Sequence, residues 1–217
     1  MKLVDVFTSA RQLLQDSNTN SALRRYDDDI LLGFANQTLK RIAVIRPDLF
    51  SMIGEVTCTV GEVLQSPPTD SIRIMDILRV KLGNSVREVN RQTMDQSHPE
   101  WADDDAGPCV NWMRHPRNAN KFFIYPKAPT GQILICEYSQ SPPIYDLTTE
   151  VALLPDAYFP CVVDGVVYLA EAVDSEHVNN QRADMFQRSL TGALTAALES
   201  RSVTDSDSAG LDKKGQA

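Results

Sequence analysis

The spacing of apolar residues changes twice along this chain of 217 residues, and this change limits the folds that the chain can adopt. In residues 4–14 and 30–45, apolar side chains recur every three to four positions, which is typical of helices with one buried face. From about Gly54 the period falls to two, which is typical of a half-buried strand. After residue 156 the helical period returns. The pattern therefore predicts helices at both ends of the chain and strands in the middle.

Breakers and capping residues mark the ends of the predicted helices. Residues 16–18 (Asp-Ser-Asn) end the first helix, and Pro47 ends the second because the residue before a proline avoids the helical conformation. Three aspartates at 27–29 favour the start of the second helix, since the amides and the dipole at a helix N-terminus favour carboxylates. Pro155 and Asp156 indicate the start of a third helix, and a further helix is expected to run to about Glu199.

The middle of the chain contains five candidate strands, at residues 56–60, 72–82, 86–90, 121–125 and 132–138. The proline, glycine and asparagine residues between them are typical of turns in an antiparallel sheet. Residues 94–108 have neither period, and we interpret them as an irregular surface excursion, with a functional loop as the alternative.

These elements predict an α+β fold. We expect a discontinuous antiparallel helical bundle, built from residues 1–52 and 153–199, with a small antiparallel β domain of residues 53–152 inserted between its halves. Residues 200–217 are polar and have almost no apolar anchor, so burial cannot offset the entropy of ordering them. We therefore expect a flexible tail that is disordered in the isolated chain; the open alternatives are ordering on a partner and no role at all.

Composition argues against several classes of function. The chain has 29 acidic and 21 basic side chains and a net charge of -8, which is unfavourable for general binding to phosphate backbones. No apolar run approaches the roughly 18 residues that a membrane helix requires, and the first residues lack the apolar segment of a signal peptide. We therefore expect neither membrane association nor general nucleic-acid binding.

The chemically reactive residues predict no metal site, no cofactor and no enzyme. The four cysteines are Cys58, Cys109, Cys136 and Cys161. They lie far apart without the spacing of metal ligands, so we interpret them as buried thiols in a reducing compartment. The three histidines are His98, His115 and His177, and we interpret them as surface or hinge residues. Phosphate loops and hydrolase motifs are missing from the sequence, although residues distant in sequence can still assemble a catalytic site in space.

Several segments resemble, in order and spacing, the head-to-tail adaptor proteins of short-tailed bacteriophages. The segments are Arg25-Tyr26-x-Asp28 with Leu31-Leu32, Ile45-Arg46-Pro47-Asp48-Leu49-Phe50, Phe123-Ile124-Tyr125-Pro126, Leu154-Pro155-Asp156-x-Tyr158 and Val163-Asp164-x-Val166-x-Tyr168-x-Ala170. The resemblance spans most of the chain. It implies a helical bundle with a β insertion that forms a ring of about twelve copies beneath the portal protein and joins it to tail or nozzle proteins. It also implies a virion protein of the neck, assembled in the host cytoplasm.

The resemblance implies two sets of functional residues. The C-terminal extension of such adaptors reaches along the portal, which makes Leu211 an apolar docking anchor and Lys213 and Lys214 its charged partners. DNA passes through the ring without specific binding, and an acidic lining favours this because it repels the phosphate backbone. The candidate lining residues are Asp27, Asp28, Asp29, Asp103, Asp104 and Asp105.

Two other functions stay open at this point. The chain can be another neck or tail component, such as a stopper or a tail-tube gatekeeper, which its position in the assembly would decide. It can also be a tail-associated hydrolase whose site is assembled in space from Asp, Glu and His side chains. Electron microscopy of the protein mixed with portal separates the hydrolase from the assembly proteins, because only the latter form rings on portals.

Overall fold

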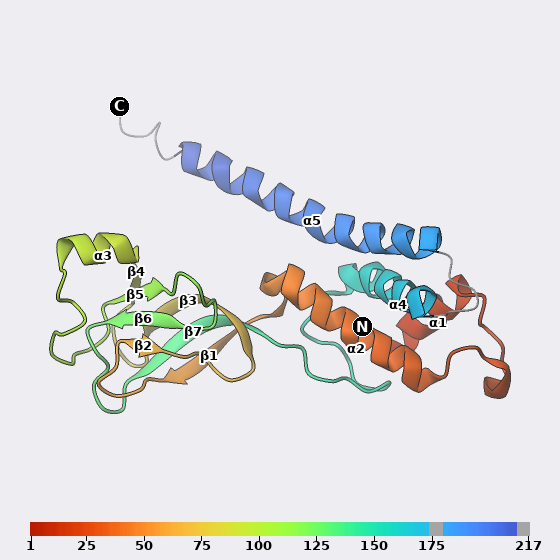
Figure 1. Cartoon of the computed structure of the whole chain (residues 1–217), viewed down its shortest axis with the longest axis horizontal. Helices are drawn as coiled ribbons and strands as arrows, with labels where there is room; N and C mark the ends of the chain where they lie inside the picture. Colours follow the sequence, from red (N-terminus) through yellow and green to blue (C-terminus); the bar gives the residue numbers. More distant parts are fainter. Residues whose placement is uncertain (174–179, 212–217) are drawn as a thin grey trace. The chain divides into compact units, whose positions relative to one another are not determined.

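The structure is a computed structural model that describes residues 1–173 and 180–211, with the side chains of residues 197–211 outside the description. The chain divides into two compact units, which are described separately below (Figure 1). The helical unit takes Met1–Arg46 and Pro142–Ala217, and the β unit takes Pro47–Ser141. The sequence places these boundaries later, at 52/53 and 152/153. They differ because strand β1 already begins at Ser51 and because the returning chain contacts the helical unit from residue 145 onward.

The helical unit contains α1 (Leu3–Leu13), α2 (Asp28–Ile45), α4 (Phe159–Val173) and α5 (Asn180–Leu211), with 3-10 turns at Ser21–Leu23 and Asp156–Tyr158. Helix α4 is the most apolar of them, and it packs against α1, α2 and α5. Gly165 allows α4 to approach α2 closely, because a Cβ atom at this position would lie 2.2 Å from Cγ2 of Thr38. The core of this unit is therefore built around α4.

Helix α5 continues beyond its predicted end. The sequence predicts an end near Glu199, whereas the helix reaches Leu211. Residues 200–209 contain neither glycine nor proline, so backbone hydrogen bonding can continue there even without an apolar face. Residues 212–217, which include Lys213 and Lys214, lie outside the described residues.

The chain is fixed at both points where it leaves and re-enters the helical unit. At the exit, the buried Arg46 donates a hydrogen bond of 3.1 Å from Nη1 to the carbonyl of Leu194 in α5. At the return, Asn36 of α2 donates from Nδ2 to the carbonyl of Tyr145 (2.9 Å), and the Tyr145 amide donates to Oδ1 of Asn36 (2.8 Å). We call these two contacts the exit clamp and the return clamp.

The β unit contains two small sheets (Figure 1). The first sheet has the order β1-β7-β3, with β1 (Ser51–Thr57), β7 (Ile133–Gln140) and β3 (Ser71–Val80) all antiparallel. The second has the order β2-β6-β5-β4, with β2 (Leu64–Gln65), β6 (Phe122–Tyr125), β5 (Asn111–Arg114) and β4 (Arg87–Glu88). The β4–β5 pair is parallel and the other pairs are antiparallel. A 3-10 turn at Pro47–Phe50 precedes β1.

Residues 94–108 differ in part from the irregular surface excursion that the sequence predicts. Helix α3 (Arg91–Ser97) begins before this segment and extends into it, and the side chain of its N-cap residue Asn90 accepts a hydrogen bond from the amide of Gln92 (2.8 Å). Met94 and Trp101 are buried against Met113 of β5, and the three form a second small core. Most of the segment is exposed, which agrees with the surface interpretation, but Met94 and Trp101 are not surface residues because they pack against β5.

Candidate functional site

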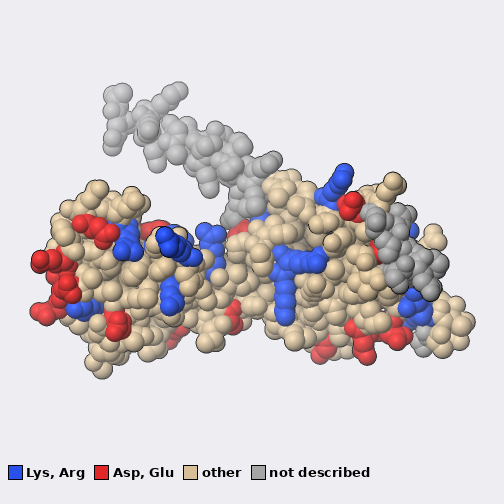
Figure 2. Space-filling model, viewed as in Figure 1, with Lys and Arg blue, Asp and Glu red and all other residues tan. Residues whose placement is uncertain are grey.

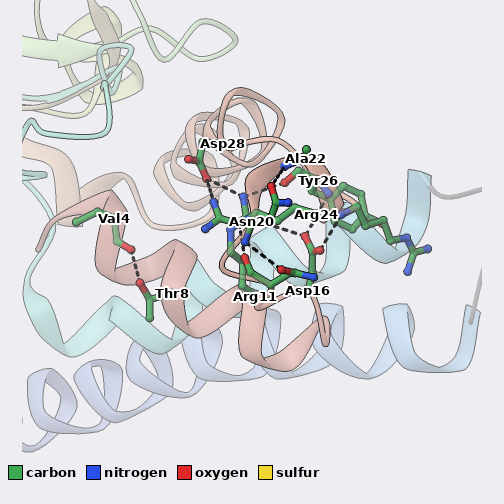
Figure 3. Close-up of polar contacts among 11 residues, drawn as sticks. Val4, Thr8, Arg11, Asp16, Asn20, Ala22, Arg24, Tyr26 and Asp28 are labelled. Carbon is green, nitrogen blue, oxygen red and sulfur yellow. Dashed lines mark hydrogen bonds and ion pairs between the residues drawn. The ribbon is translucent and has the colours of Figure 1, made fainter.

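A network of buried charges joins α1 to the start of α2 (Figure 3). Arg11 of α1 donates to Oδ2 of Asp16 (2.8 Å), to the carbonyl of Tyr26 (2.8 Å) and to Oδ1 of Asp28 (2.7 Å). The side chains of Arg11 and Asp16 are only 8% and 6% exposed. Arg24 approaches the same Asp28 oxygen at 3.7 Å. We call Arg11, Asp16, Tyr26 and Asp28 the Arg11 corner.

The Arg11 corner gives a structural role to the Arg25-Tyr26-x-Asp28 segment. The backbone amide of Arg25 donates to Oδ1 of Asp16 (2.7 Å), and that of Tyr26 donates to its Oδ2 (3.2 Å). The Tyr26 hydroxyl donates to the carbonyl of Ala170 in α4 (2.9 Å), and burial raises the pKa of this hydroxyl. The segment therefore fixes the turn before α2 to both α1 and α4.

The three acidic candidates of the helical unit have different surroundings. Asp27 is the N-cap residue of α2, and Asp28 and Asp29 lie in its first turn, so the predicted helix start is at this triplet. Asp28 is held by Arg11 and Arg24, whereas Asp27 and Asp29 are exposed and have no ion pair among the described residues. Only Asp27 and Asp29 keep a fully available negative charge.

The acidic candidates of the β unit also divide into held and free carboxylates. Oδ2 of Asp104 accepts a hydrogen bond from the Tyr125 hydroxyl (2.7 Å) and lies 2.8 Å from Nε2 of His98. The hydrogen bond from Tyr125, followed by that with His98, lowers the pKa of Asp104, and Asp104 in turn raises the pKa of Tyr125. Asp103 and Asp105 are exposed, without an ion pair in the described part of the chain. Residues 27–29 belong to the helical unit and residues 103–105 to the β unit.

The four cysteines and His115 have surroundings that explain them without a reaction. All four cysteines are free and buried, and burial raises the pKa of the Cys109 thiol to about 12 and that of Cys136 to about 11. The ring of His115 stacks on Phe123 at a centroid distance of 5.4 Å. His177 lies outside the described residues. Within residues 1–173 and 180–211, no group of three or more His, Cys, Asp or Glu side chains could hold a metal ion.

Basic side chains form a surface of the β unit that the sequence analysis did not identify. Arg73, Arg117 and Lys121 line a pocket of about 260 Å³ beside β5 and β6. Arg114, which also lines this pocket, pairs with Glu88 at 2.6 Å. Figure 2 shows acidic and basic side chains interspersed on the visible face of each unit. The sequence does contain a signal for this surface: Arg114, Arg117 and Lys121 lie close together around His115-Pro116. The net charge of -8 for the whole chain does not reveal such a local cluster.

Large apolar side chains are exposed in both units. They include Leu23, Ile30, Val44, Ile144 and Met185 in the helical unit and Ile53, Val60, Leu82 and Val110 in the β unit. A mostly apolar groove of about 440 Å³ follows one face of α2. We call it the α2 groove, and its lining residues are Asp29, Leu32, Gly33, Asn36, Gln37, Lys40 and Ile144. In the part of the chain that the structure describes, no helix has the length and apolar character needed to cross a bilayer.

The predicted docking residues of the C-terminus are only partly described. Leu211 is the last residue of α5, and Lys213 and Lys214 fall outside the described residues.

The sequence model of the family described as SU10 adaptor protein matches residues 1–212. The chain belongs to this adaptor family, which confirms the resemblance to phage head-to-tail adaptors. A search of curated proteins found no match.

Proposed function

We propose that the chain is a head-to-tail adaptor that forms a ring beneath the portal protein of a phage and connects it to the tail. The observation that carries this proposal is the match to the adaptor family over residues 1–212. Exposed apolar side chains on both units support it, because a ring requires two different surfaces on each copy. A ring of about twelve copies, built on a helical bundle of α1, α2, α4 and α5, is the expected assembly.

DNA would pass through the ring without specific binding. The net charge of -8 per chain supports this, since a lumen with excess negative charge repels the duplex. Asp27, Asp29, Asp103 and Asp105 are the best candidates for the lining, because each is exposed and has no ion pair among the described residues. Asp28 and Asp104 are weaker candidates, since each is already held by other side chains.

The C-terminal end of the chain would attach the ring to the portal. In this proposal Leu211 is an apolar anchor at the end of α5, and Lys213 and Lys214 pair with acidic groups of the portal. Truncation after Ser200 removes all three residues and leaves the described core of both units in place. We expect the truncated chain to fold normally and to sediment with portal rings less than the full chain does. Equal co-sedimentation would contradict the docking role.

Electron microscopy of the purified protein mixed with portal tests the proposal. We expect rings stacked on one end of the portal, with an open passage along the axis. Mass measurement at several concentrations would show whether the ring forms in the free protein or only on the portal. Particles in which the protein lies on an already formed adaptor ring would indicate a stopper or gatekeeper instead, and an absence of rings in both measurements would overturn the proposal.

A further inference from the structure

Gly165 and Gly33 are helical glycines with opposite surroundings, and of these two only Gly165 is explained by the chain itself. A Cβ atom on Gly165 would collide with Thr38, so the packing of α4 on α2 requires that glycine. A Cβ atom on Gly33, which lies inside α2, would meet nothing within 4 Å. Glycine weakens a helix interior relative to alanine, and an exposed glycine allows an outside group to approach the helix backbone closely. The contacts of this chain therefore leave Gly33 without a reason, and an external partner would supply one.

Gly33 lies in the α2 groove, which has the character of a docking site. Leu32 is half-buried there, and Ile144 is 80% exposed. Asp29 and Lys40 lie toward opposite ends of the groove, roughly 16 Å apart along the helix at 1.5 Å per residue. Asp29 has no ion pair among the described residues, so the N-terminal end of the groove carries a free negative charge. The groove is suited to an apolar side chain flanked by cations.

The turn between β3 and β4 presents such a side chain. Leu82 is 94% exposed, and its φ of 58° is a conformation that glycine or asparagine adopts at lower cost. The turn is fixed by hydrogen bonds from the Gly83 amide to the Val80 carbonyl (2.9 Å) and from the Val80 amide to the Asn84 carbonyl (3.0 Å). A large apolar residue is thus held at the tip of an ordered turn, without burial in its own chain.

The charges around Leu82 complement those of the α2 groove. Arg79 and Arg87 flank the turn, are exposed and have no ion pair among the residues that the structure describes. Lys81, which precedes Leu82, is paired with Glu55 at 2.7 Å. The turn therefore presents free cations beside its apolar tip. The N-terminal end of the groove presents the free carboxylate of Asp29, and Lys40 lies toward the opposite end.

We propose that Leu82 of one copy inserts into the α2 groove of a second copy, above Gly33, with Arg79 and Arg87 near Asp29. The inserting turn and the receiving groove are different surfaces of the same chain, so each copy uses one of each and the contact propagates from copy to copy. Such a contact closes into a ring when the rotation between copies allows it. This inference depends on the proposed ring, and it names the surfaces that hold the ring together.

Cysteine cross-linking tests the contact directly. The four native cysteines are buried, so disulfides that form on oxidation can be assigned to the cysteines introduced at the surface. The double variant Gln37→Cys with Leu82→Cys should give a ladder of covalent multimers on oxidation, because each copy then links to two neighbours. The matched control is Gln37→Cys with Val60→Cys, since Val60 is a turn residue of the same unit that is 53% exposed. A ladder of equal strength from the control, or no ladder beyond dimers from the test variant, would overturn the inference.

Substitutions that keep the fold supply an independent measurement. Gly33→Leu fills the groove, where the structure has open space, and Leu82→Asn removes the apolar tip at a φ that asparagine tolerates. Each should raise the concentration needed for half-maximal assembly by about tenfold or more, whereas Val60→Asn should leave it unchanged within about twofold. If the wild type forms rings that neither variant weakens, this contact is wrong and the adaptor proposal stands. If the wild type forms no ring, alone or on the portal, the adaptor proposal fails and this contact fails with it.

Discussion

The Arg11 corner of the helical unit and the Asp104 cluster of the β unit have similar chemistry in opposite surroundings. Both hold a carboxylate with two or more hydrogen bonds. The ion pair of Arg11 with Asp16 is 8% and 6% exposed, whereas the pair of His98 with Asp104 is 44% and 35% exposed. A buried charge that loses its partner is costly to the fold, while an exposed one is compensated by water. The Arg11 corner therefore stabilises the fold, whereas the His98 and Asp104 side chains of the Asp104 cluster stay accessible to other molecules.

Arg11→Met should have the largest effect, because it leaves the buried Asp16 carboxylate without its cation, with hydrogen bonds from the amides of Arg25 and Tyr26 alone. We expect a loss of about 3–5 kcal/mol in the free energy of unfolding, measured by urea denaturation. The control is Arg24→Met, since Arg24 is more exposed and lies 3.7 Å from Asp28, and its expected loss is about 1 kcal/mol or less. Equal losses in the two variants would show that burial does not distinguish these charges.

Substitutions of Gly165 and Gly33 extend the comparison from charged side chains to a packed and an open position of the helical unit. Gly165→Ala should lower the free energy of unfolding by about 1–3 kcal/mol, because the new methyl group collides with Thr38 between α4 and α2. Gly33→Ala should instead raise it by roughly 0.5–1 kcal/mol in the unassembled protein, since its methyl group has open space. Chemical denaturation below the assembly concentration checks both values. A stabilising effect at Gly165 would contradict the close packing of α4 on α2.

Tyr125→Phe tests the exposed cluster through its pH dependence. Hydrogen bonds from Tyr125 and with His98 hold the pKa of Asp104 below its ordinary value of 3.8. A carboxyl whose pKa is lowered by folding stabilises the protein above its unfolded pKa, and this contribution is lost as the pH falls through the folded pKa. Without the Tyr125 hydroxyl, the pKa of Asp104 should rise toward 3.8, and the loss of stability below about pH 4 should become smaller. A carboxyl NMR titration of both proteins measures the shift, and an unchanged pKa would contradict the role of Tyr125.

The smallest expected effect concerns Asp146, an exposed residue of the returning chain. Hydrogen bonds from the hydroxyls and amides of Thr149 and Thr148 lower the pKa of Asp146 to about 2. Thr149→Val removes one hydroxyl donor, so the pKa of Asp146 should rise while the fold stays unchanged. The same NMR titration detects this shift, and Thr195→Val, a change at a distant exposed threonine of α5, is the control.

The long elements could be predicted from the sequence because each repeats its pattern over several turns. The stripe from residue 30 to 45, with Asp27–29 before it and Pro47 after it, predicts α2 almost to its observed bounds of Asp28–Ile45. The predicted strands at 72–82 and 132–138 likewise agree closely with β3 (Ser71–Val80) and β7 (Ile133–Gln140), because each is a long segment with turn residues at both ends. The predicted α+β class is therefore confirmed.

Strands β5 and β2 and the tertiary contacts could not be predicted. Strand β5 has four residues and β2 has two, and their partner β6 lies elsewhere in the sequence. The equally short β6 and β4 lie within the predicted strands 121–125 and 86–90. Helix α3 buries only Met94 of its seven residues, so it has no apolar stripe. The triple aspartate at 27–29 marks a helix start in the sequence, but nothing local indicates that Asp28 would pair with Arg11, which lies 17 positions away.

The exit clamp and the return clamp also have a mechanical consequence. The backbone passes between the two units after residue 46 and before residue 142. Next to the first crossing lies the bond between Arg46 and Leu194, and close to the second lie the paired bonds between Tyr145 and Asn36. A pull along the backbone at either crossing therefore acts first on these bonds to α5 and α2, before it reaches α4.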